Sequence, residues 1–588
     1  MGVMSRRRAP RRALWAVTAL LLLAPVAGCS GGGLPRSTGS DTGGATAPAG
    51  SGATGATSGS AQSSTAESGG RGGQAATGLT GRPSAEQLSA ARADVARLSV
   101  PQLAAQLVVP RQRGAGQDAA AALRSGGYGG YAVFRDNLPQ GAAAVRTARA
   151  DNAAFERAMR ESGRDWPAFV SIDQEGGPVT RLDSPLTLFP AVMALGAAGD
   201  PGLARRVGAA SGAELRGLGY TVVLAPVADV TVGEADPTIG VRSPGSDPRA
   251  VSRISSALAA GYLDAGILPT LKHFPGHGGV GDDSHLGTVT QRAPLSQMRE
   301  RDLLPFAEAV SAGAPAIMTA HIVLTSVDPQ RPSTVSQKVL TGLLREQLGF
   351  TGLVVTDALE MAAVASRFGA GQAAVEAVRA GADVLLMPAD AKAAVTALVK
   401  AVDDGSVTRG RLEESAARMV ATLRAAVHDP PAPSEPGSHQ QVAKDVAAAA
   451  ITQLGGECGA RLVGDGIRVS GGDAADREAL TTAARAAGLR TGSGTSVVLR
   501  GGSTYRAAED DGESTASAPA TGDVVVALDA PYTLARDRAR VAKLATFGRT
   551  PATFAELVRV LLGERTASGA LPVAVGNHAI GSGCGRSS

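Results

Sequence analysis

The sequence predicts an α/β protein, with a (β/α)8 TIM barrel followed by a smaller α/β C-terminal domain. Eight short apolar runs each precede a segment whose Ala, Leu and Arg content suits a helix, and a (β/α)8 barrel requires this repeat. The runs are continuously apolar rather than alternating, as expected of parallel strands buried on both faces. They end at Val109, Phe134, Ile172, Pro226, Leu271, Ala320, Thr356 and Met387.

The first 29 residues have the features of an export signal. An arginine-rich start precedes an apolar stretch from about Leu14 to Val26, which is too short to predict a membrane span. Val26 to Cys29 resembles the bacterial lipobox, in which the cysteine becomes the acylated first residue. We therefore expect a lipoprotein signal peptide over 1–29, lipidation of Cys29 and anchoring to the outer face of the bacterial cell membrane. An ordinary signal peptide with an incidental cysteine is the alternative.

The next segment, residues 30–83, consists of Gly, Ser, Thr and Ala with almost no large apolar side chain. It cannot bury enough apolar surface to offset the entropy lost on ordering, so we predict a flexible tether. The barrel domain is expected over 84–428, a proline-rich linker over 429–440 and the C-terminal α/β domain over 441–588. Strands are expected in this last domain at GIRVSGG, SVVLRGG, DVVVALD, KLATFG and LPVAV.

The composition restricts the class of partner. The net charge of the 588-residue chain is only +4, and many basic residues fall in the first dozen positions, so we expect no nucleic-acid partner. We also expect a monomer. Apart from Cys29 there are two cysteines, Cys458 and Cys584, which an exported protein could join in a disulfide. Two separate buried thiols are the alternative.

Polar side chains follow five of the eight apolar runs. In barrels of this type the carboxyl ends of the strands line the active site. We therefore expect these residues to meet at a single pocket. They are Asp173, Asp229, Lys272, His273, His321 and Asp357.

Asp357, in GLVVTDALEM, follows the seventh run. A carboxylate that faces a pocket with Lys272 would stay ionised and could serve as a nucleophile or an electrostatic stabiliser. The same residue in a strand-to-helix turn could instead be a helix N-cap. The residue alone does not decide between these interpretations.

The loop after the fifth run, LKHFPGHGGVGDDSHLGT, combines glycines with histidines and aspartates. In its Asp283-Ser284-His285 segment the carboxylate can accept a hydrogen bond from the imidazole and fix its tautomer. That pair would provide a general acid/base with a pKa near the operating pH on a loop that can move. A solvated loop with a local Asp-His contact is the alternative.

A metal site is a further interpretation of the same loop. His273, His277 and His285, with Asp282 or Asp283, supply enough ligands for zinc. Glycine-rich spacing preorganises no ligand set, however, and no second ligand cluster complements it. We therefore predict no metal and no cofactor.

Six motifs stand out together: KHFPGHGGVGDDSH, SIDQEGGPVTRL, APVADV, GVRSPGSDP, IMTAHIV and LLREQLGFTGLVVTDALEM. Together they resemble glycoside hydrolase family 3, specifically its β-N-acetylglucosaminidase branch. The resemblance runs from about Leu98 to Met387, and it is fainter in the C-terminal domain. The sequence departs from the family pattern at three places: Pro178 replaces an arginine, Pro244 replaces a phenylalanine, and Gly279-Val280 stands where polar residues are more usual.

This resemblance implies a role for each matching residue. It makes Asp357 the nucleophile, His285 the acid/base and Asp283 the residue that assists His285. It places sugar-binding residues at Asp173, Arg181, Arg242, Lys272 and His273. No role follows for His277.

The resemblance also implies a reaction. We expect a retaining hydrolase that removes terminal non-reducing β-linked N-acetylglucosamine from cell-wall (peptidoglycan) fragments or chitooligosaccharides through a covalent glycosyl-aspartate. A neutral histidine base adds no negative charge, so phosphate could also reach the intermediate, and phosphorolysis is an alternative. A β-glucosidase of the same family and a non-catalytic, cell-wall-binding lipoprotein also stay open at this point.

Overall fold

The computed structural model describes residues 78–79, 81–281, 287–427, 431–501 and 518–585. The predicted signal peptide with Cys29, nearly all of the predicted tether, and the predicted catalytic residues Asp283 and His285 lie outside the described residues.

Each of the eight apolar runs contains a strand. The fifth run is divided at Thr270 into β7 and β8, next to Pro269, whose lack of an N–H group made a continuous strand difficult to predict. The strands are β1 (Val108–Val109), β2 (Gly130–Val133), β3 (Phe169–Ile172), β6 (Val222–Val223), β7 (Leu268–Pro269), β8 (Leu271–Phe274), β10 (Ala316–Thr319), β12 (Leu353–Val355) and β13 (Leu385–Leu386).

These strands pair in parallel and in chain order. The ladders are β2-β3-β6-β7, β8-β10-β12 and β1-β13. Single parallel bridges connect the ladders, at Arg111 with Ala132, Val227 with Lys272, and Val355 with Val384. Strands that follow one another in the sequence are therefore neighbours in space, and the last strand, β13, pairs with the first.

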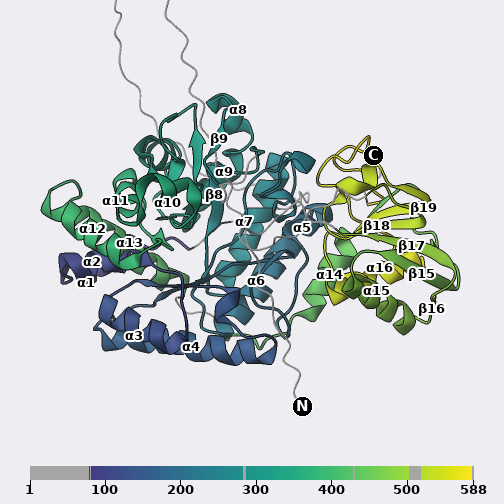
Figure 1. The fold of residues 1–588 in the computed structure, drawn as a ribbon, viewed down its shortest axis with the longest axis horizontal. Helices are drawn as coiled ribbons and strands as arrows, with labels where there is room; N and C mark the ends of the chain where they lie inside the picture. The colour runs from purple at the N-terminus through teal and green to yellow at the C-terminus, as the bar shows by residue number, and fades with distance from the viewer. Residues whose placement is uncertain (1–77, 80, 282–286, 428–430, 502–517, 586–588) are drawn as a thin grey trace, which may run out of the picture. The chain divides into compact units, whose positions relative to one another are not determined.

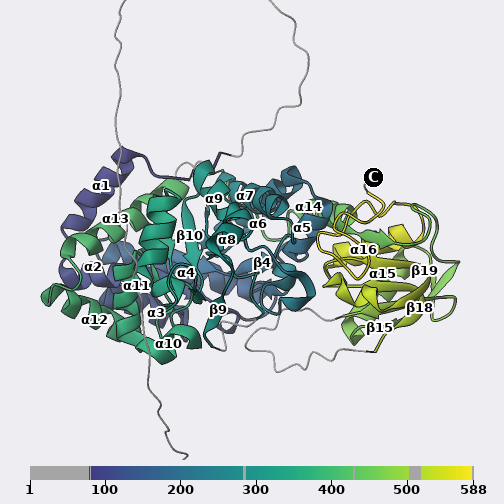
Figure 2. The ribbon, with the colours of Figure 1, turned by 90° about the horizontal axis from the view of Figure 1, so that it is seen from above.

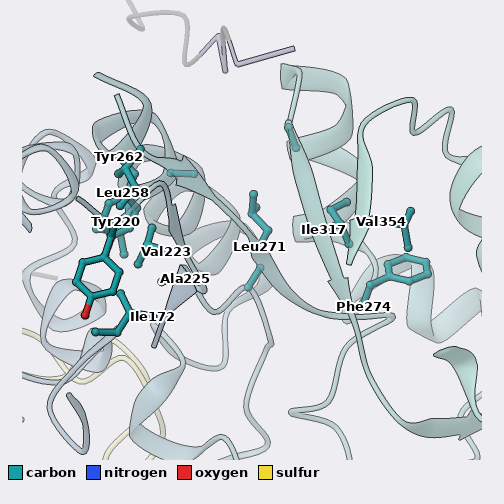
Figure 3. Close-up of a cluster of buried hydrophobic side chains, with 14 of the residues drawn as sticks. Ile172, Tyr220, Val223, Ala225, Leu258, Tyr262, Leu271, Phe274, Ile317 and Val354 are labelled. Atoms are coloured by element: carbon teal, nitrogen blue, oxygen red, sulfur yellow. The ribbon is translucent and has the colours of Figure 1, made fainter. Parts of the chain in front are cut away.

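Alternate residues of a strand enter two different apolar clusters. In β10, Ile317 belongs to a cluster that packs the strands against the helices, whereas Met318 belongs to a cluster formed largely by the strands themselves. Figure 3 shows part of the first cluster, with Phe274 of β8 near Ile317 and Val354 of β12. Burial on both faces explains why the runs are apolar throughout.

Helices follow the strands. Helix α1 packs against α13, and α2 packs against α12 (Figures 1 and 2). The two helices that precede β1 therefore lie beside the two helices that follow β13. The helices are α1 (Ala85–Ala96), α2 (Val100–Gln106), α3 (Gly116–Gly126), α4 (Ala142–Glu161), α5 (Val192–Ala198), α6 (Pro201–Gly217), α7 (Pro248–Asp264), α8 (Leu295–Glu300), α9 (Leu304–Ala312), η5 (Lys338–Gln347), α10 (Ala362–Phe368), α11 (Ala370–Ala380), α12 (Ala391–Asp403) and α13 (Arg409–Ala426).

Local sequence determines where α6 and α7, two neighbouring helices of 17 residues each, begin. Helices α6 and α7 both start with an Asp-Pro pair. The Asp200 side chain accepts hydrogen bonds from the amides of Gly202 and Leu203, and Asp247 accepts one from Ala250. The aspartate satisfies amides that have no partner within the helix, and the proline has the backbone angle that a first helical turn needs.

The C-terminal residues form a second sheet. Its order is β14-β19-β18-β17-β15-β16, and all neighbours are parallel except β14 and β19. Helices α14 (Gln440–Ala450), α15 (Ala474–Ala486) and α16 (Pro551–Leu561) accompany the sheet. The strands are β14 (Thr452–Leu454), β15 (Gly466–Gly471), β16 (Arg490–Thr491), β17 (Thr495–Arg500), β18 (Thr521–Ala527) and β19 (Arg538–Ala545).

Four of the five strands predicted here are present, and the prediction of a fifth strand at LPVAV is wrong. Leu571 to Val575 has no strand assigned to it. Its side chains Leu571, Val573 and Val575 are buried, which accounts for the apolar alternation, but its backbone bonds to loops. The Pro572 carbonyl accepts a hydrogen bond from the amide of Ser246, 3.0 Å away.

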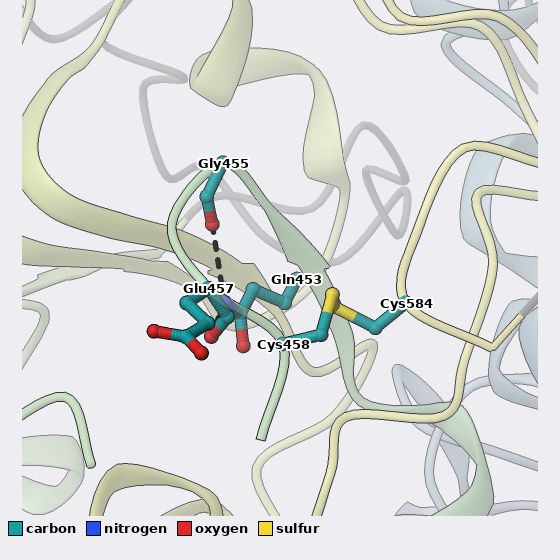
Figure 4. The surroundings of a disulfide bond; sticks show 5 residues. All are labelled: Gln453, Gly455, Glu457, Cys458 and Cys584. Atoms are coloured by element: carbon teal, nitrogen blue, oxygen red, sulfur yellow. Dashed lines mark hydrogen bonds between the residues drawn. A yellow bond between two sulfur atoms is a disulfide. The ribbon is translucent and has the colours of Figure 1, made fainter. Parts of the chain in front are cut away.

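Cys458 and Cys584 form a disulfide (Figure 4), with their Cα atoms 5.7 Å apart. The bond joins the loop after β14 to the last described residues, across 126 positions of sequence. The Gln453 side-chain amide holds the same loop by donating to the carbonyls of Gly455 and Glu457, at 3.1 and 3.2 Å.

Candidate active site

A cavity of about 440 Å³ lies at the carboxyl ends of the strands of the first sheet system. Its lining includes apolar side chains of the strand cluster, among them Leu224, Met318 and Leu386. It brings together every described residue for which the sequence predicted a catalytic or sugar-binding role. These are Asp173, Arg181, Arg242, Lys272, His273 and Asp357.

Buried ion pairs hold the cations of the cavity. Lys272 Nζ lies 2.8 Å from Asp173 Oδ1 and 2.7 Å from Glu175 Oε1. Arg242 donates two parallel hydrogen bonds to Glu175, Nε to Oε2 at 2.9 Å and Nη2 to Oε1 at 2.8 Å. Arg181 is more loosely paired, with Nη2 3.7 Å from Asp173 Oδ2.

Glu175 is the central anion, and its side chain is only 1% exposed. Burial alone would raise the pKa of Glu175, but Arg242 and Lys272 outweigh burial and hold that pKa well below its usual range. Burial would likewise lower the pKa of Lys272, but Asp173 and Glu175 raise it. Glu175 and Lys272 are therefore charged at neutral pH.

Sequence reasoning missed Glu175, although it lies within the motif SIDQEGGPVTRL. It belongs to a short hairpin of β4 (Gln174–Gly176) and β5 (Val179–Thr180) that no apolar run signals. Gly177 forms the hairpin turn, with φ +56°, and a Cβ there would lie 2.7 Å from Ala191 Cα. Only glycine fits such a close approach.

The hairpin separates two cavities. Val179 and Arg181 line the first cavity, of about 440 Å³, whereas Pro178 and Thr180 line a second cavity of about 390 Å³. Pro178, one of the departures from the family pattern, is therefore not among the residues that line the first cavity.

Asp229 lies behind His273 rather than in the cavity lining. It is fully buried, and its Oδ2 lies 2.7 Å from His273 Nδ1. Burial alone would raise the pKa of Asp229, but His273 and the backbone amide of His277 outweigh burial and lower that pKa below its usual value. The Asp229 carboxylate is therefore ionised. The ionised Asp229 carboxylate accepts a hydrogen bond from His273 Nδ1, and His273 Nε2 lies 3.5 Å from Arg242 Nη2.

The structure gives His277 a structural position. Its amide donates to Asp229 Oδ1 at 2.7 Å, so Asp229 holds both His273 and the start of the loop that continues towards residue 282. Burial lowers the pKa of the His277 ring to about 4, so this ring is neutral at pH 7.

Asp357 follows β12 and lines the cavity. It is not a helix N-cap, because α10 begins at Ala362 with Met361 at the N-cap position. The Ala358 amide donates to Asp357 Oδ1 at 2.8 Å, which fixes the orientation of the carboxylate. His321, expected at the same rim, is fully buried and bonds to the backbone next to Asp357.

The cavity lining also includes Arg111, Phe134 and Glu360, which the sequence did not single out. The guanidinium carbons of Arg111 and Arg181 lie 4.4 and 5.0 Å from the centre of the Phe134 ring. Arg111 Nη1 is 3.8 Å from Glu360 Oε1. Cation–π attraction therefore holds both guanidinium groups against the Phe134 ring.

Within the described parts of the chain, no group of three or more His, Cys, Asp and Glu side chains has the arrangement to hold a metal ion. The alternative zinc site is not tested by this finding, because Asp282, Asp283 and His285 are not among the described residues.

A small cavity at strand ends, with an accessible carboxylate facing buried cations, has the composition of a glycosidase active site. The sequence model of the Glycosyl hydrolase family 3 N terminal domain matches residues 99–422, and the chain belongs to this family. It is therefore a glycosidase by family.

The similarity to named relatives extends well beyond the short motifs. Beta-hexosaminidase A from Pseudoalteromonas piscicida is 35% identical over 55% of this chain, and the match spans 59% of that protein. Beta-hexosaminidase LpqI from Mycobacterium tuberculosis is 36% identical over 47% of this chain and 73% of that protein.

Solved structures show the same fold. A family 3 β-N-acetylglucosaminidase from Paenibacillus sp. str. FPU-7 has a TM-score of 0.70 at 28% identity, covering 81% of this chain and 99% of its own. The structure of M. tuberculosis LpqI has a TM-score of 0.51 at 33% identity, covering 57% of this chain and 96% of its own. The structural match to the Paenibacillus protein therefore covers more of this chain than the match to LpqI does.

Proposed function

We propose that this chain is a retaining β-N-acetylhexosaminidase that removes terminal non-reducing β-linked N-acetylglucosamine from peptidoglycan fragments or chitooligosaccharides. The observation that carries the proposal is the position of Asp357, whose carboxylate faces the same cavity as Asp173, Lys272 and His273. The names of the similar hexosaminidases support it. We also propose a closed (β/α)8 barrel, supported by the pairing of β13 with β1.

In the proposed mechanism Asp357 attacks the anomeric carbon, and the glycosidic bond breaks as protonated His285 gives its proton to the leaving oxygen. Neutral His285 then takes a proton from water, which attacks the glycosyl-aspartate and releases the sugar with its original configuration. Asp283 orients His285. Most retaining glycosidases use two carboxylates about 5 to 5.5 Å apart, and here a histidine replaces one of them.

The buried ion pairs provide the sugar-binding side of the site. Lys272 and Arg242 can donate to sugar hydroxyls, and Asp173 can accept from them. Because Glu175 already holds both cations, they need no rearrangement when the sugar binds. Such preorganisation lowers the cost of positioning the anomeric carbon against Asp357.

One assay tests the proposal. Wild type should hydrolyse a chromogenic β-N-acetylglucosaminide, and Asp357→Ala and His285→Ala should each lose about 10³-fold or more in kcat. Asp404→Ala, in an exposed turn, is the matched control and should keep wild-type activity. An inactive, folded wild type would contradict the proposal and favour a wall-binding protein.

The same assay distinguishes the hexosaminidase from a phosphorylase and from a β-glucosidase. Product formation with and without phosphate separates hydrolysis from phosphorolysis. The ratio of kcat/KM for the N-acetylglucosaminide and the matching glucoside separates a hexosaminidase from a β-glucosidase. NMR of the first-formed anomer tests retention, because an inverted product is incompatible with a glycosyl-aspartate.

We also propose that the protein is exported and anchored by a lipid on Cys29. Among the residues described by the structure, no helix is long and apolar enough to cross a membrane. The apolar stretch of the export signal precedes those residues. Cell fractionation tests the anchor: wild type should stay with the membrane, and Cys29→Ser should leave it. Equal distribution of the two proteins would refute lipidation at this residue.

A further inference from the structure

His321 lies directly behind Asp357, between β10 and β11 (Ile322–Leu324), and its side chain is fully buried. Its two ring nitrogens have different partners. Nε2 is 2.8 Å from the carbonyl oxygen of Ala358, the residue after Asp357. Nδ1 is 2.8 Å from the hydroxyl oxygen of Thr334.

The carbonyl of Ala358 fixes the tautomer of the neutral ring. A carbonyl oxygen only accepts, so Nε2 carries the proton and donates it to Ala358. Nδ1 of the neutral ring is then an acceptor and takes the hydrogen bond of the Thr334 hydroxyl. The Ala320 carbonyl, 3.0 Å away, and the Thr319 hydroxyl oxygen are also within reach of that hydroxyl.

The hydrogen bonds continue from Thr334 back to the amide of Asp357. The Thr319 hydroxyl oxygen is 2.7 Å from that of Thr334 and accepts from the Asp357 amide at 3.4 Å. A series of hydrogen-bonded groups therefore connects the Asp357 amide, through Thr319, Thr334 and His321, to the Ala358 carbonyl. Hydrogen bonds in such a series strengthen one another.

Ala358 is thus held at both ends. Its amide donates to Asp357 Oδ1 at 2.8 Å, and its carbonyl accepts from His321 Nε2. A shift of the Ala358 backbone would move the hydrogen bond that orients the Asp357 carboxylate.

We propose that His321 is a positioning residue for Asp357: its Nε2–H group holds the Ala358 backbone and thereby aims the carboxylate at the anomeric carbon. This inference rests on the proposed role of Asp357 as the nucleophile. His321 does not line the cavity, so it acts through the backbone and not on the sugar.

The expected defect is in the chemical step. The ion pairs of Lys272 and Arg242 with Glu175 do not involve His321, so ground-state sugar binding is preserved when it is changed. A misplacement of a reacting group by about 1 Å can cost on the order of 10²-fold in rate.

Two conservative variants separate the function of the two nitrogens. Glutamine reaches the position of Nε2 and keeps an N–H donor for the Ala358 carbonyl. Asparagine ends near Nδ1 and leaves that carbonyl without its donor. We expect His321→Asn to lower kcat by about 10 to 100-fold with KM changed by less than about threefold, and His321→Gln to keep kcat within about threefold of wild type.

The outcomes are distinct from those that test the proposed function. An inactive wild type, or a fully active Asp357→Ala, would refute the proposed function. If Asp357→Ala is inactive while His321→Asn and His321→Gln have equal kcat, or if the loss is in KM alone, only the positioning role is refuted.

Thermal unfolding establishes whether each variant is folded. Should His321→Asn not fold, Thr334→Val provides the same test, because it keeps the shape of the side chain and removes the hydroxyl that bonds to Nδ1. The positioning role requires a lower kcat with KM retained in this variant too, and an unchanged kcat would overturn it.

Discussion

Replacing Glu175 by glutamine should destabilise the protein and weaken sugar binding together. The Glu175 carboxylate is the shared partner of two buried cations, with Lys272 Nζ at 2.7 Å and Arg242 Nη2 at 2.8 Å from Oε1. Glutamine keeps the shape but removes the negative charge. Lys272 would retain only Asp173 as an anionic partner, and Arg242 would keep at most one of its two parallel hydrogen bonds.

Removing one partner of a buried ion pair costs about 3 to 5 kcal/mol because a charge is left without compensation. We therefore expect a decrease of that size in the free energy of unfolding of Glu175→Gln at pH 7. Displacement of both cations from the sugar should lower kcat/KM by about 10 to 100-fold, mainly through KM, which corresponds to about 1.4 to 2.8 kcal/mol.

The pH dependence has a definite sign. The pKa of Glu175 in the folded protein is below its ordinary value of 4.5, so the stability that it contributes is fully present above pH 4.5 and is lost as the pH falls below that value. The difference in stability between wild type and Glu175→Gln should therefore be constant from pH 5 to 8 and shrink in more acidic solution.

Asp383→Asn is the matched control. Asp383 is also a fully buried carboxylate among cations, with Arg345 at 2.6 Å and Arg418 at 2.6 Å, and it precedes β13 at the end away from the cavity. Denaturant unfolding and steady-state kinetics on both variants test the reasoning. The control should lose stability while its folded fraction keeps KM. A Glu175→Gln protein with wild-type KM, or a control with an equal rise in KM, would refute the assigned role.

Three further predictions concern stability. Replacing Cys458 and Cys584 by serine should cost about 2 to 5 kcal/mol of unfolding free energy with kcat unchanged, measured by denaturant unfolding; equal stability would contradict a structural bond. Burial raises the pKa of Asp302 from 3.8 to about 6, so ionisation of this carboxyl costs the folded protein stability between these values. Asp302→Asn should therefore gain stability relative to wild type as the pH rises from about 4 to 6, by up to about 3 kcal/mol. Thermal melting at each pH measures this difference, and parallel pH curves for the two proteins would contradict it. A chain that ends at residue 430 should be unstable or aggregate, since Phe547 is buried in the same apolar cluster as the strands and its carbonyl accepts from the Ala191 amide; a soluble, cooperatively unfolding fragment would show that this contact is dispensable.

The strands of the first sheet system were predictable because both of their faces are buried. Ile317 and Met318 are adjacent and enter different clusters, so no polar residue interrupts the run. The same criterion failed for Leu571 to Val575, where apolar side chains are buried by a loop. It also missed β14 and β16, which are short and contain polar residues.

The site was predictable to the extent that position along a strand determines it. Asp173 and Asp357 come after β3 and β12, Lys272 lies within β8, and the parallel arrangement brings them to one cavity. The partners of these residues were not predictable, because contacts such as that of Glu175 with Arg242, 67 positions away, depend on a hairpin and a loop without a sequence signal. For the same reason His321 was expected at the rim but lies beneath it.

The two sides of the cavity are held by different kinds of interaction, and each suits the charge that it supports. On the sugar-binding side, Lys272 and Arg242 are buried cations, and only an anion such as Glu175 can offset their loss of hydration. On the other side the proposed nucleophile, Asp357, is itself an anion. A second carboxylate beside it would oppose its ionisation, whereas a histidine and two hydroxyls hold its backbone without adding negative charge. The carboxylate can therefore be fixed in direction and remain available to attack.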